Sequence, residues 1–191
     1  MKRTILNLSL ILTVILSSVA FTNIADKKEV KTTESTVTWK GYKVTGSHEG
    51  TVNLKSGFLT FEADKLVGGE FVVDMTSLSS TDLEGEYKGK LDGHLKSDDF
   101  FGVKNHPTAK LVITETKATG KNKYEVTGDL TIKNKTNPIT FDLSVYGSKA
   151  TGALKIDRSK YDVRYGSGSF FDNLGDKTIY DEFDLVVDLQ M

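Results

Sequence analysis

Histidines are the residues of this chain with the most versatile chemistry, because their charge changes near neutral pH and their ring nitrogens bind metals. The chain has three of them, His48, His94 and His106. They lie far apart in the sequence and form no His-x-His or His-x₃-His pair, so their spacing does not favour a zinc site. We therefore expect each ring to hydrogen-bond to a neighbouring loop, and we expect neither a metal nor a cofactor.

A second group of polar residues lies near the C-terminus. Residues 166–169 read Gly-Ser-Gly-Ser, which is similar to a nucleophile elbow but does not fit G-x-S-x-G. The acids Asp172, Asp176, Asp181 and Glu182 miss the spacing of a calcium-binding loop. No phosphate-binding glycine loop is present, and the lack of cysteine excludes thiol chemistry. The sequence indicates no catalytic residue, and we expect that the protein is not an enzyme.

Arg158, which follows Asp157 directly, has two alternative roles. Its guanidinium could bind an anionic head group such as a phosphate, because the planar fork fits two oxygen atoms at once. Alternatively, it forms a structural ion pair with a nearby acid. An enzyme that uses the region of His94 or Arg158 remains a further alternative, which no motif supports.

The elements that must position these residues are mainly β-strands, because apolar and polar residues alternate along most of the chain from Ser35 onward. Eight or nine strands with one apolar face predict an antiparallel sheet. Closure into an up-and-down barrel removes the exposed sheet edges, so we predict an all-β, eight-stranded antiparallel barrel, with a two-sheet sandwich as the alternative. The predicted strands centre on residues 35–41, 52–54, 59–61, 70–75, 109–114, 124–132, 139–145, 150–156 and 179–189, and turns are predicted at residues 46–50 and 55–57.

Two irregular segments interrupt the alternation, residues 76–107 and residues 158–177. Within the first, residues 90–96 can form about two helical turns, since Leu91 and Leu95 lie four apart on one face. The second is rich in Gly, Ser, Tyr and Phe. Loops longer than about 15 residues usually carry function, so we expect these two segments to form one mouth of the barrel, either as a plug or as a gate.

Residues 1–20 have the features of a secretory signal peptide: two basic residues, an apolar stretch, and small residues that end at Ala20. An uncleaved membrane anchor is the alternative, but polar residues interrupt the apolar stretch before it reaches the roughly 18 residues of a span. We expect cleavage after Ala20, a flexible lead-in over residues 21–34, and a single domain over residues 35–191.

The charges of the chain are balanced and interspersed. The formal net charge is −1, with 25 basic against 26 acidic residues. This balance excludes the clustered basic surface of a nucleic-acid-binding protein. It also gives no support to strong electrostatic association with a membrane, and we expect no stable membrane insertion.

Three sequence runs resemble the signature of a known family. They are the run HLKSDDFF at residues 94–101 with Pro-Thr-Ala at residues 107–109, the run VTGDLTI at residues 126–132 with Pro-Ile at residues 138–139, and the run IDRSKY at residues 156–161. In this order they are similar to the YceI-like family, whose members are bacterial periplasmic lipid (polyisoprenoid) binding proteins. One departure is Asn134, where the family usually has Gly in the turn. Asn tolerates the left-handed conformation, so we expect the turn to persist.

The resemblance implies a lipocalin-like barrel with a short helix in the long connection and a periplasmic location. It also implies an elongated apolar pocket for an isoprenoid tail, either a polyisoprenoid or an isoprenoid quinone, and it makes a homodimer a further expectation. Periodicity alone predicts a filled apolar core instead. The alternative is therefore an exported structural or stress-response barrel that acts through its surface loops. The candidate ligand-binding residues are Trp39, Leu59, Phe61, Phe71, Val73, Phe100, Phe101, Leu111, Phe141, Arg158, Phe170, Phe171 and Phe183.

Overall fold

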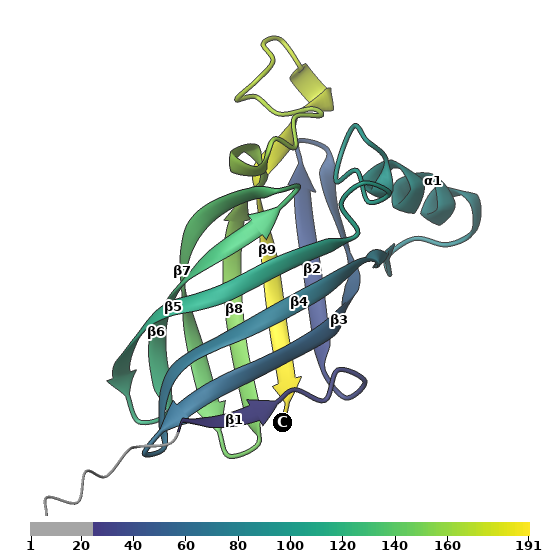
Figure 1. The fold of residues 1–191 in the computed structure, drawn as a ribbon. Coiled ribbons are helices and arrows are strands. Elements are labelled where there is room, and N and C mark those ends of the chain that lie inside the picture. Colours follow the sequence, from purple (N-terminus) through teal and green to yellow (C-terminus); the bar gives the residue numbers. More distant parts are fainter. Residues whose placement is uncertain (1–24) are drawn as a thin grey trace, which may run out of the picture.

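The protein is a β-barrel with one α-helix packed at one end (Figure 1). The structure is a computed structural model that describes residues 25–191. The predicted signal peptide over residues 1–20 therefore lies outside the described residues. The strands are β1 (Asp26–Glu29), β2 (Thr36–Lys43), β3 (Gly46–Glu62), β4 (Lys65–Ser80), β5 (Thr108–Gly120), β6 (Lys123–Ile132), β7 (Lys135–Tyr146), β8 (Lys149–Asp157) and β9 (Ile179–Gln190), and the helix is α1 (Gly85–Lys96).

Each strand from β2 to β9 pairs antiparallel with the next strand in the chain, and β9 pairs back with β2. This last pairing, which places Trp39 opposite Leu185, closes the sheet into a barrel of eight strands. The predicted all-β, up-and-down barrel is confirmed, and a two-sheet sandwich is excluded. Closure satisfies the backbone groups that would otherwise form two open edges.

The described part of the predicted flexible lead-in, residues 25–34, contains a strand, which differs from the prediction. Asp26–Glu29 form β1, which pairs with residues 58–61 of β3. The Val30 side chain is buried, and its backbone N–H donates to the Gly57 carbonyl at 2.8 Å. The strand is too short and too charged to show a period-two pattern. Its pairing with β3, and not its own sequence pattern, defines it.

The strand β3 is longer than the sequence suggested. The turns predicted at residues 46–50 and 55–57 are wrong, because both lie inside β3. A register shift between Leu54 and Ser56 absorbs one residue as a bulge. Gly50 permits a close approach: a Cβ at this position would lie 2.6 Å from the Trp39 ring. Here glycine marks close packing in a strand.

The long connection after β4 is also more regular than expected. The strand β4 continues to Ser80, five residues beyond the predicted end at Met75. The helix begins at Gly85 and ends at Lys96, so it is longer than the two predicted turns over residues 90–96. The predicted short helix in the long connection is confirmed, and it begins at Gly85, five residues before the predicted start.

The two ends of the barrel differ in what covers them. One end, called the helix end below, carries the β2–β3 turn, α1 with residues 97–107, the β6–β7 turn and the β8–β9 connection over residues 158–178 (Figure 1). The opposite end has short hairpin turns and the C-terminus (Figure 1). The inward residues of all the barrel strands, with Leu95, Phe100 and Phe101 from the helix end, form one continuous apolar core.

Candidate functional site

The barrel interior contains an apolar cavity beneath the helix end, called the upper cavity. Its volume is about 120 Å³. The side chains around it come from seven of the eight barrel strands, from α1 and from both covering segments, residues 97–107 and 158–178. Arg158 is the only charged residue among them. The lining is Trp39, Gly41, Tyr42, Val52, Val73, Met75, Leu78, Leu95, Phe100, Phe101, Ala109, Leu130, Ile132, Ile156, Arg158, Ile179, Tyr180, Phe183 and Leu185.

A second cavity of about 70 Å³, the lower cavity, lies deeper in the barrel. Its lining includes Phe71, Leu111 and Phe141. Four side chains line both cavities, so the two lie next to each other with a narrow waist between them. The waist residues are Val73, Leu130, Ile156 and Leu185.

A row of aromatic rings covers the upper cavity. The Phe100 ring lies 5.0 Å from the Phe101 ring, and the Phe101 ring lies 6.4 Å from the Phe183 ring, both in edge-to-face geometry. Above this row, the His94 ring contacts Phe100 at 5.7 Å and Tyr165 at 4.4 Å. Edge-to-face pairs add stabilisation beyond burial, so the cover is a packed aromatic layer that joins the helix side to the barrel wall.

Arg158 organises the β8–β9 connection from inside. Its side chain is 2% exposed, and its guanidinium donates to the carbonyls of Val163, Ile179 and Tyr180 at 2.8–3.2 Å. Burial lowers the pKa of Arg158, while the nearby Asp181 carboxylate, 3.4 Å away, opposes this shift. The group remains charged, because arginine titrates far above neutral pH. Of its two alternative roles, these contacts match the structural one.

Lys133 bridges the two covering segments. It lies in the β6–β7 turn, where both Lys133 and Asn134 have positive φ, so the turn persists with Asn134 as predicted. Its ammonium donates to the Phe100 carbonyl at 3.0 Å and to the Asp162 carbonyl at 3.1 Å. No backbone hydrogen bond within the described residues joins residues 97–107 to residues 158–178. The Lys133 bridge and the side-chain contacts of Phe100 and Tyr165 therefore hold the cover closed.

The helix α1 is fixed to β4 by a compact polar cluster. The Asp92 carboxylate accepts hydrogen bonds from the Ser80 N–H at 2.7 Å, from the Ser79 hydroxyl at 2.9 Å and from Lys88 at 3.0 Å. Burial raises the pKa of Asp92, but these hydrogen bonds outweigh it and lower the pKa to about 2. Lys88 also donates to Ser79 and to the Ser80 carbonyl. The cluster positions Leu95 and the following aromatic residues over the cavity.

A larger groove lies outside the cover, called the outer groove. Its volume is about 590 Å³, and its lining mixes both charge signs with apolar groups. Arg164 donates to Asp162 within the groove. The lining consists of Asp98, Asp99, Lys133, Asp162, Arg164, Tyr165, Gly166, Phe171, Leu174 and Lys177.

The predicted ligand-binding residues fall into four groups. Trp39, Val73, Phe100, Phe101, Arg158 and Phe183 line the upper cavity. Phe71, Val73, Leu111 and Phe141 line the lower cavity. Leu59 and Phe61 are buried in the core and line neither cavity, because well-packed neighbours surround them. Phe170 and Phe171 point outward, with 39% and 50% exposure.

Several lining residues were not predicted. Leu130, Ile132, Ile156 and Leu185 follow the same period-two alternation as the predicted ones, so the pattern could have identified them. Gly41 is different, because it lines the cavity through the absence of a side chain. A Cβ at Gly41 would meet no atom within 4 Å.

The three histidines do not share a site. His48 hydrogen-bonds to Asp82 at 2.8 Å, and His94 packs against aromatic rings. Within residues 25–191, no group of three His, Cys, Asp or Glu side chains converges as metal ligands would. In the same range, none of the helices combines the length and the apolar character needed to cross a bilayer.

Comparison with known proteins identifies the family. The chain matches the family model described as a YceI-like domain over residues 29–191. A UPF0312 protein of Pseudomonas putida (strain W619) is 36% identical over 98 residues, which cover 51% of this chain and 49% of that protein. A UPF0312 protein of Vibrio parahaemolyticus is 28% identical over 137 residues, which cover 65% of this chain and 69% of that protein. The matched region thus spans only about half the length of the Pseudomonas relative.

Solved structures show the same architecture. BcnA of Burkholderia cenocepacia superposes with a TM-score of 0.64 at 25% identity, covering 84% of this chain and 98% of that chain. A protein from Saccharophagus degradans, described as a polyisoprenoid binding domain, gives a TM-score of 0.57 at 14% identity and covers 84% of this chain and 95% of that chain. This second likeness concerns the fold alone. The motifs at residues 94–101, 126–132 and 156–161, the closed barrel and the matched region agree: the chain belongs to the YceI-like family.

Proposed function

We propose that the protein is an exported lipid-binding protein that holds the tail of an isoprenoid lipid, such as a polyisoprenoid or an isoprenoid quinone, inside the barrel. It acts as a carrier or a reservoir, and no chemical step takes place. The observation that carries the proposal is the upper cavity, with its apolar lining and its aromatic cover. The description of the Saccharophagus degradans domain as polyisoprenoid binding supports the same ligand class.

The cavity volumes indicate how much of a tail fits. A cavity of about 150 Å³ holds one benzene-sized molecule, so the upper cavity matches about one five-carbon unit. Burial of each CH₂ contributes about 0.8 kcal/mol, which gives about 3–4 kcal/mol per unit before the costs of ordering the tail. A longer tail must turn the waist side chains aside to reach the lower cavity. Rotation of Val73 and Leu130 would join the two spaces along the barrel.

The periplasmic location belongs to the same proposal. The N-terminal residues have the pattern of a signal peptide, and the chain has no cysteine that would need oxidation or reduction after export. The barrel forms a single domain that buries its own core.

The second candidate is an exported structural or stress-response barrel that acts through its surface loops. The specific observation in its favour is the waist, which separates two small cavities where a carrier of long tails requires one continuous tunnel.

Native mass spectrometry separates the two candidates. The full chain is expressed in a bacterial host with export, and the mature protein is purified, analysed intact and then extracted with organic solvent. We expect a co-purifying species of isoprenoid mass at close to one per chain, released by the solvent. A clean mass of the protein alone, together with no uptake of added isoprenoid, would favour the filled barrel.

A further inference from the structure

Two exposed phenylalanines lie at the helix end, and nothing in the barrel explains them. Among residues 25–191, Phe170 and Phe171 are the only exposed phenylalanines. Both follow Gly168 and Ser169 in the β8–β9 connection, which projects beyond the barrel rim (Figure 1). Exposed apolar side chains close together indicate a contact surface more often than scattered ones do.

The backbone holds both rings in this outward position. The N–H groups of Phe170 and Phe171 both donate to the Ser167 carbonyl, at 3.2 and 3.1 Å. Ser167 is itself completely buried, and the Gly166 carbonyl accepts from the Ile179 N–H at 2.8 Å. The rings are therefore presented by an ordered turn that is tied to the start of β9.

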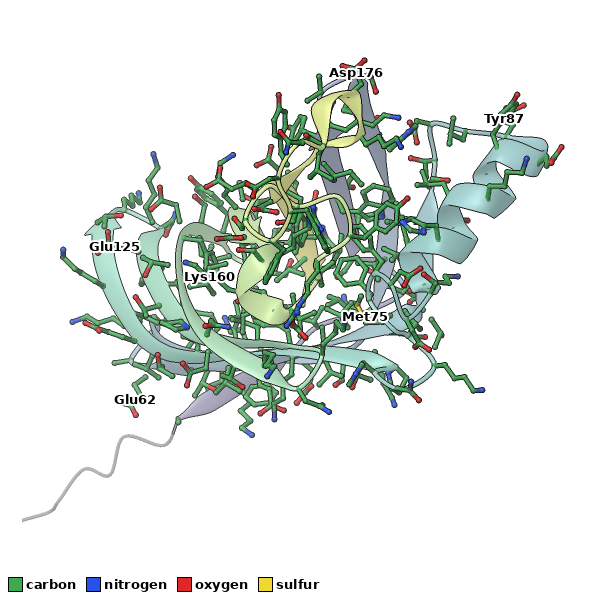
Figure 2. All side chains as sticks on the ribbon, turned by 90° about the horizontal axis from the view of Figure 1, so that it is seen from above. Glu62, Met75, Tyr87, Glu125, Lys160 and Asp176 are labelled. Atoms are coloured by element: carbon green, nitrogen blue, oxygen red, sulfur yellow. The ribbon has the colours of Figure 1, made fainter. Side chains whose placement is uncertain are left out.

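Further exposed apolar side chains lie on the same connection or next to it. Tyr165 is 49% exposed and lines the outer groove together with Phe171 and Leu174. Val44, in the β2–β3 turn, is exposed beside the same connection, since its N–H donates to the Thr178 carbonyl at 3.1 Å. Seen along the barrel from above, the connection lies over the barrel opening while Tyr87 points away on α1 (Figure 2).

Cations lie on the same connection as the two phenylalanines. The Arg164 guanidinium lies 5.0 Å from the Phe170 ring centroid, and Lys177 lines the same groove as Phe171. A ring that enters the acyl boundary of a bilayer places such a cation at the level of the lipid phosphates. Asp172 and Asp176 lie on the same segment, so its net charge is small and apolar contact must supply most of the binding.

We propose that the outer part of the β8–β9 connection, residues 164–177, docks reversibly on the surface of a phospholipid bilayer, with Phe170 and Phe171 in the headgroup–acyl boundary. The inner part of the same connection begins with Arg158, whose guanidinium lies against Phe100 in the cover of the upper cavity. Docking thus brings the cover of the cavity to the membrane. This inference rests on the proposed function, because it names the bilayer as the source of the lipid that the barrel holds.

The test uses vesicles that contain no isoprenoid, so its failure is distinguishable from failure of the proposed function. The mature protein is floated with phosphatidylcholine vesicles, with and without added phosphatidylglycerol. We expect wild-type protein to float with both, with weak salt dependence. Phe170→Ser and Phe171→Ser should each lower the partition coefficient by on the order of tenfold.

Tyr146→Ser is the matched control, because Tyr146 is an exposed aromatic residue in the hairpin at the opposite end of the barrel. It should float like wild type. All variants should keep the wild-type thermal midpoint, since the substituted rings are exposed. The proposal is overturned if wild-type protein stays in solution, if Tyr146→Ser loses binding equally, or if binding needs the anionic lipid and disappears in salt. It is also overturned if the two phenylalanines instead support a concentration-dependent dimer in sedimentation velocity and no vesicle binding.

Discussion

The Arg158 guanidinium lies 5.3 Å from the centroid of the Phe100 ring, in cation–π contact. The two residues come from different covering segments, and both line the upper cavity. Arg158 is held by hydrogen bonds to backbone carbonyls of the β8–β9 connection and of the start of β9. Through its contact with Phe100, it therefore supports the aromatic cover from that side. The cover is therefore a closed layer made of two separately anchored halves, and a tail that enters from the helix end must part them.

Removal of the Lys133 bridge should loosen this cover. Lys133→Met leaves the Phe100 and Asp162 carbonyls without their charged donor, so we expect faster opening and not global unfolding. Hydrogen exchange of residues 97–107 and 158–178 should accelerate by on the order of tenfold, read by mass spectrometry. Lys135→Met, an exposed position in the same hairpin, is the control and should leave exchange unchanged. Equal hydrogen-exchange rates of the covering segments in Lys133→Met and Lys135→Met would show that the Lys133 bridge does not limit opening of the cover.

Replacement of Arg158 should destabilise the whole barrel. Arg158→Met leaves three carbonyls without their donor and removes the charge that faces Asp181, and we expect the free energy of unfolding in urea to fall by about 3–5 kcal/mol. Arg158→Lys keeps the charge but not the fork, and it should lie in between. Arg164→Met removes only an exposed ion pair with Asp162 and should leave the free energy of unfolding nearly unchanged. Similar losses for Met at both positions would contradict the structural role of Arg158.

Acid should release α1 through Asp92. The folded pKa of Asp92 is about 2, below its ordinary value of 3.8, so ionised Asp92 stabilises the fold. This stabilisation is fully present above about pH 4 and is lost as pH falls toward 2, with a magnitude of about 2 kcal/mol. Asp92→Asn should lower stability at pH 7 and flatten its pH dependence between pH 4 and 2. Urea unfolding of both proteins between pH 7 and pH 2 tests this prediction. If the free energy of unfolding of Asp92→Asn falls between pH 4 and 2 as steeply as that of the wild type, the prediction is wrong.

A side chain at Gly41 should fill the upper cavity. The position lies opposite Phe183 in the β2–β9 pair, and a Cβ there meets open space. Gly41→Leu should therefore abolish or strongly weaken isoprenoid binding while it keeps or raises thermal stability. Thr38→Leu, at an outward position on the same strand, is the matched control and should bind like wild type. Undiminished binding in Gly41→Leu would place the ligand elsewhere.

Much of the barrel was predictable because its strands alternate with period two. This alternation alone placed the side chains of Trp39, Phe141 and Phe183 on the inner surface. The length of β3 was not predictable, since Gly50 looked like a turn residue. Its lack of a side chain is required by the Ser79 carbonyl and by the Trp39 ring, which both come from other strands. The same limit applies to β1, whose four residues are ordered by their pairing with β3.

The site was predictable only in part. Alternation identifies inward side chains, but it does not distinguish a side chain that lines a cavity from one that fills the core. Leu59 and Phe71 have the same pattern, yet only Phe71 lines a cavity. The Lys133 bridge joins segments that are distant in sequence, and the Asp92 cluster joins the helix to the end of β4 across a loop; no periodic pattern indicates either contact.

The most direct test of the central claim uses Trp39, which is the only tryptophan of the chain and lines the upper cavity. Mature protein stripped of lipid by solvent is refolded and titrated with geranylgeraniol, a four-unit isoprenoid alcohol, while the Trp39 emission is recorded and the stoichiometry is read by native mass spectrometry. The account predicts a saturable change in emission at one ligand per barrel. No change in emission and no bound species, in a refolded protein with the native circular dichroism spectrum, would contradict it.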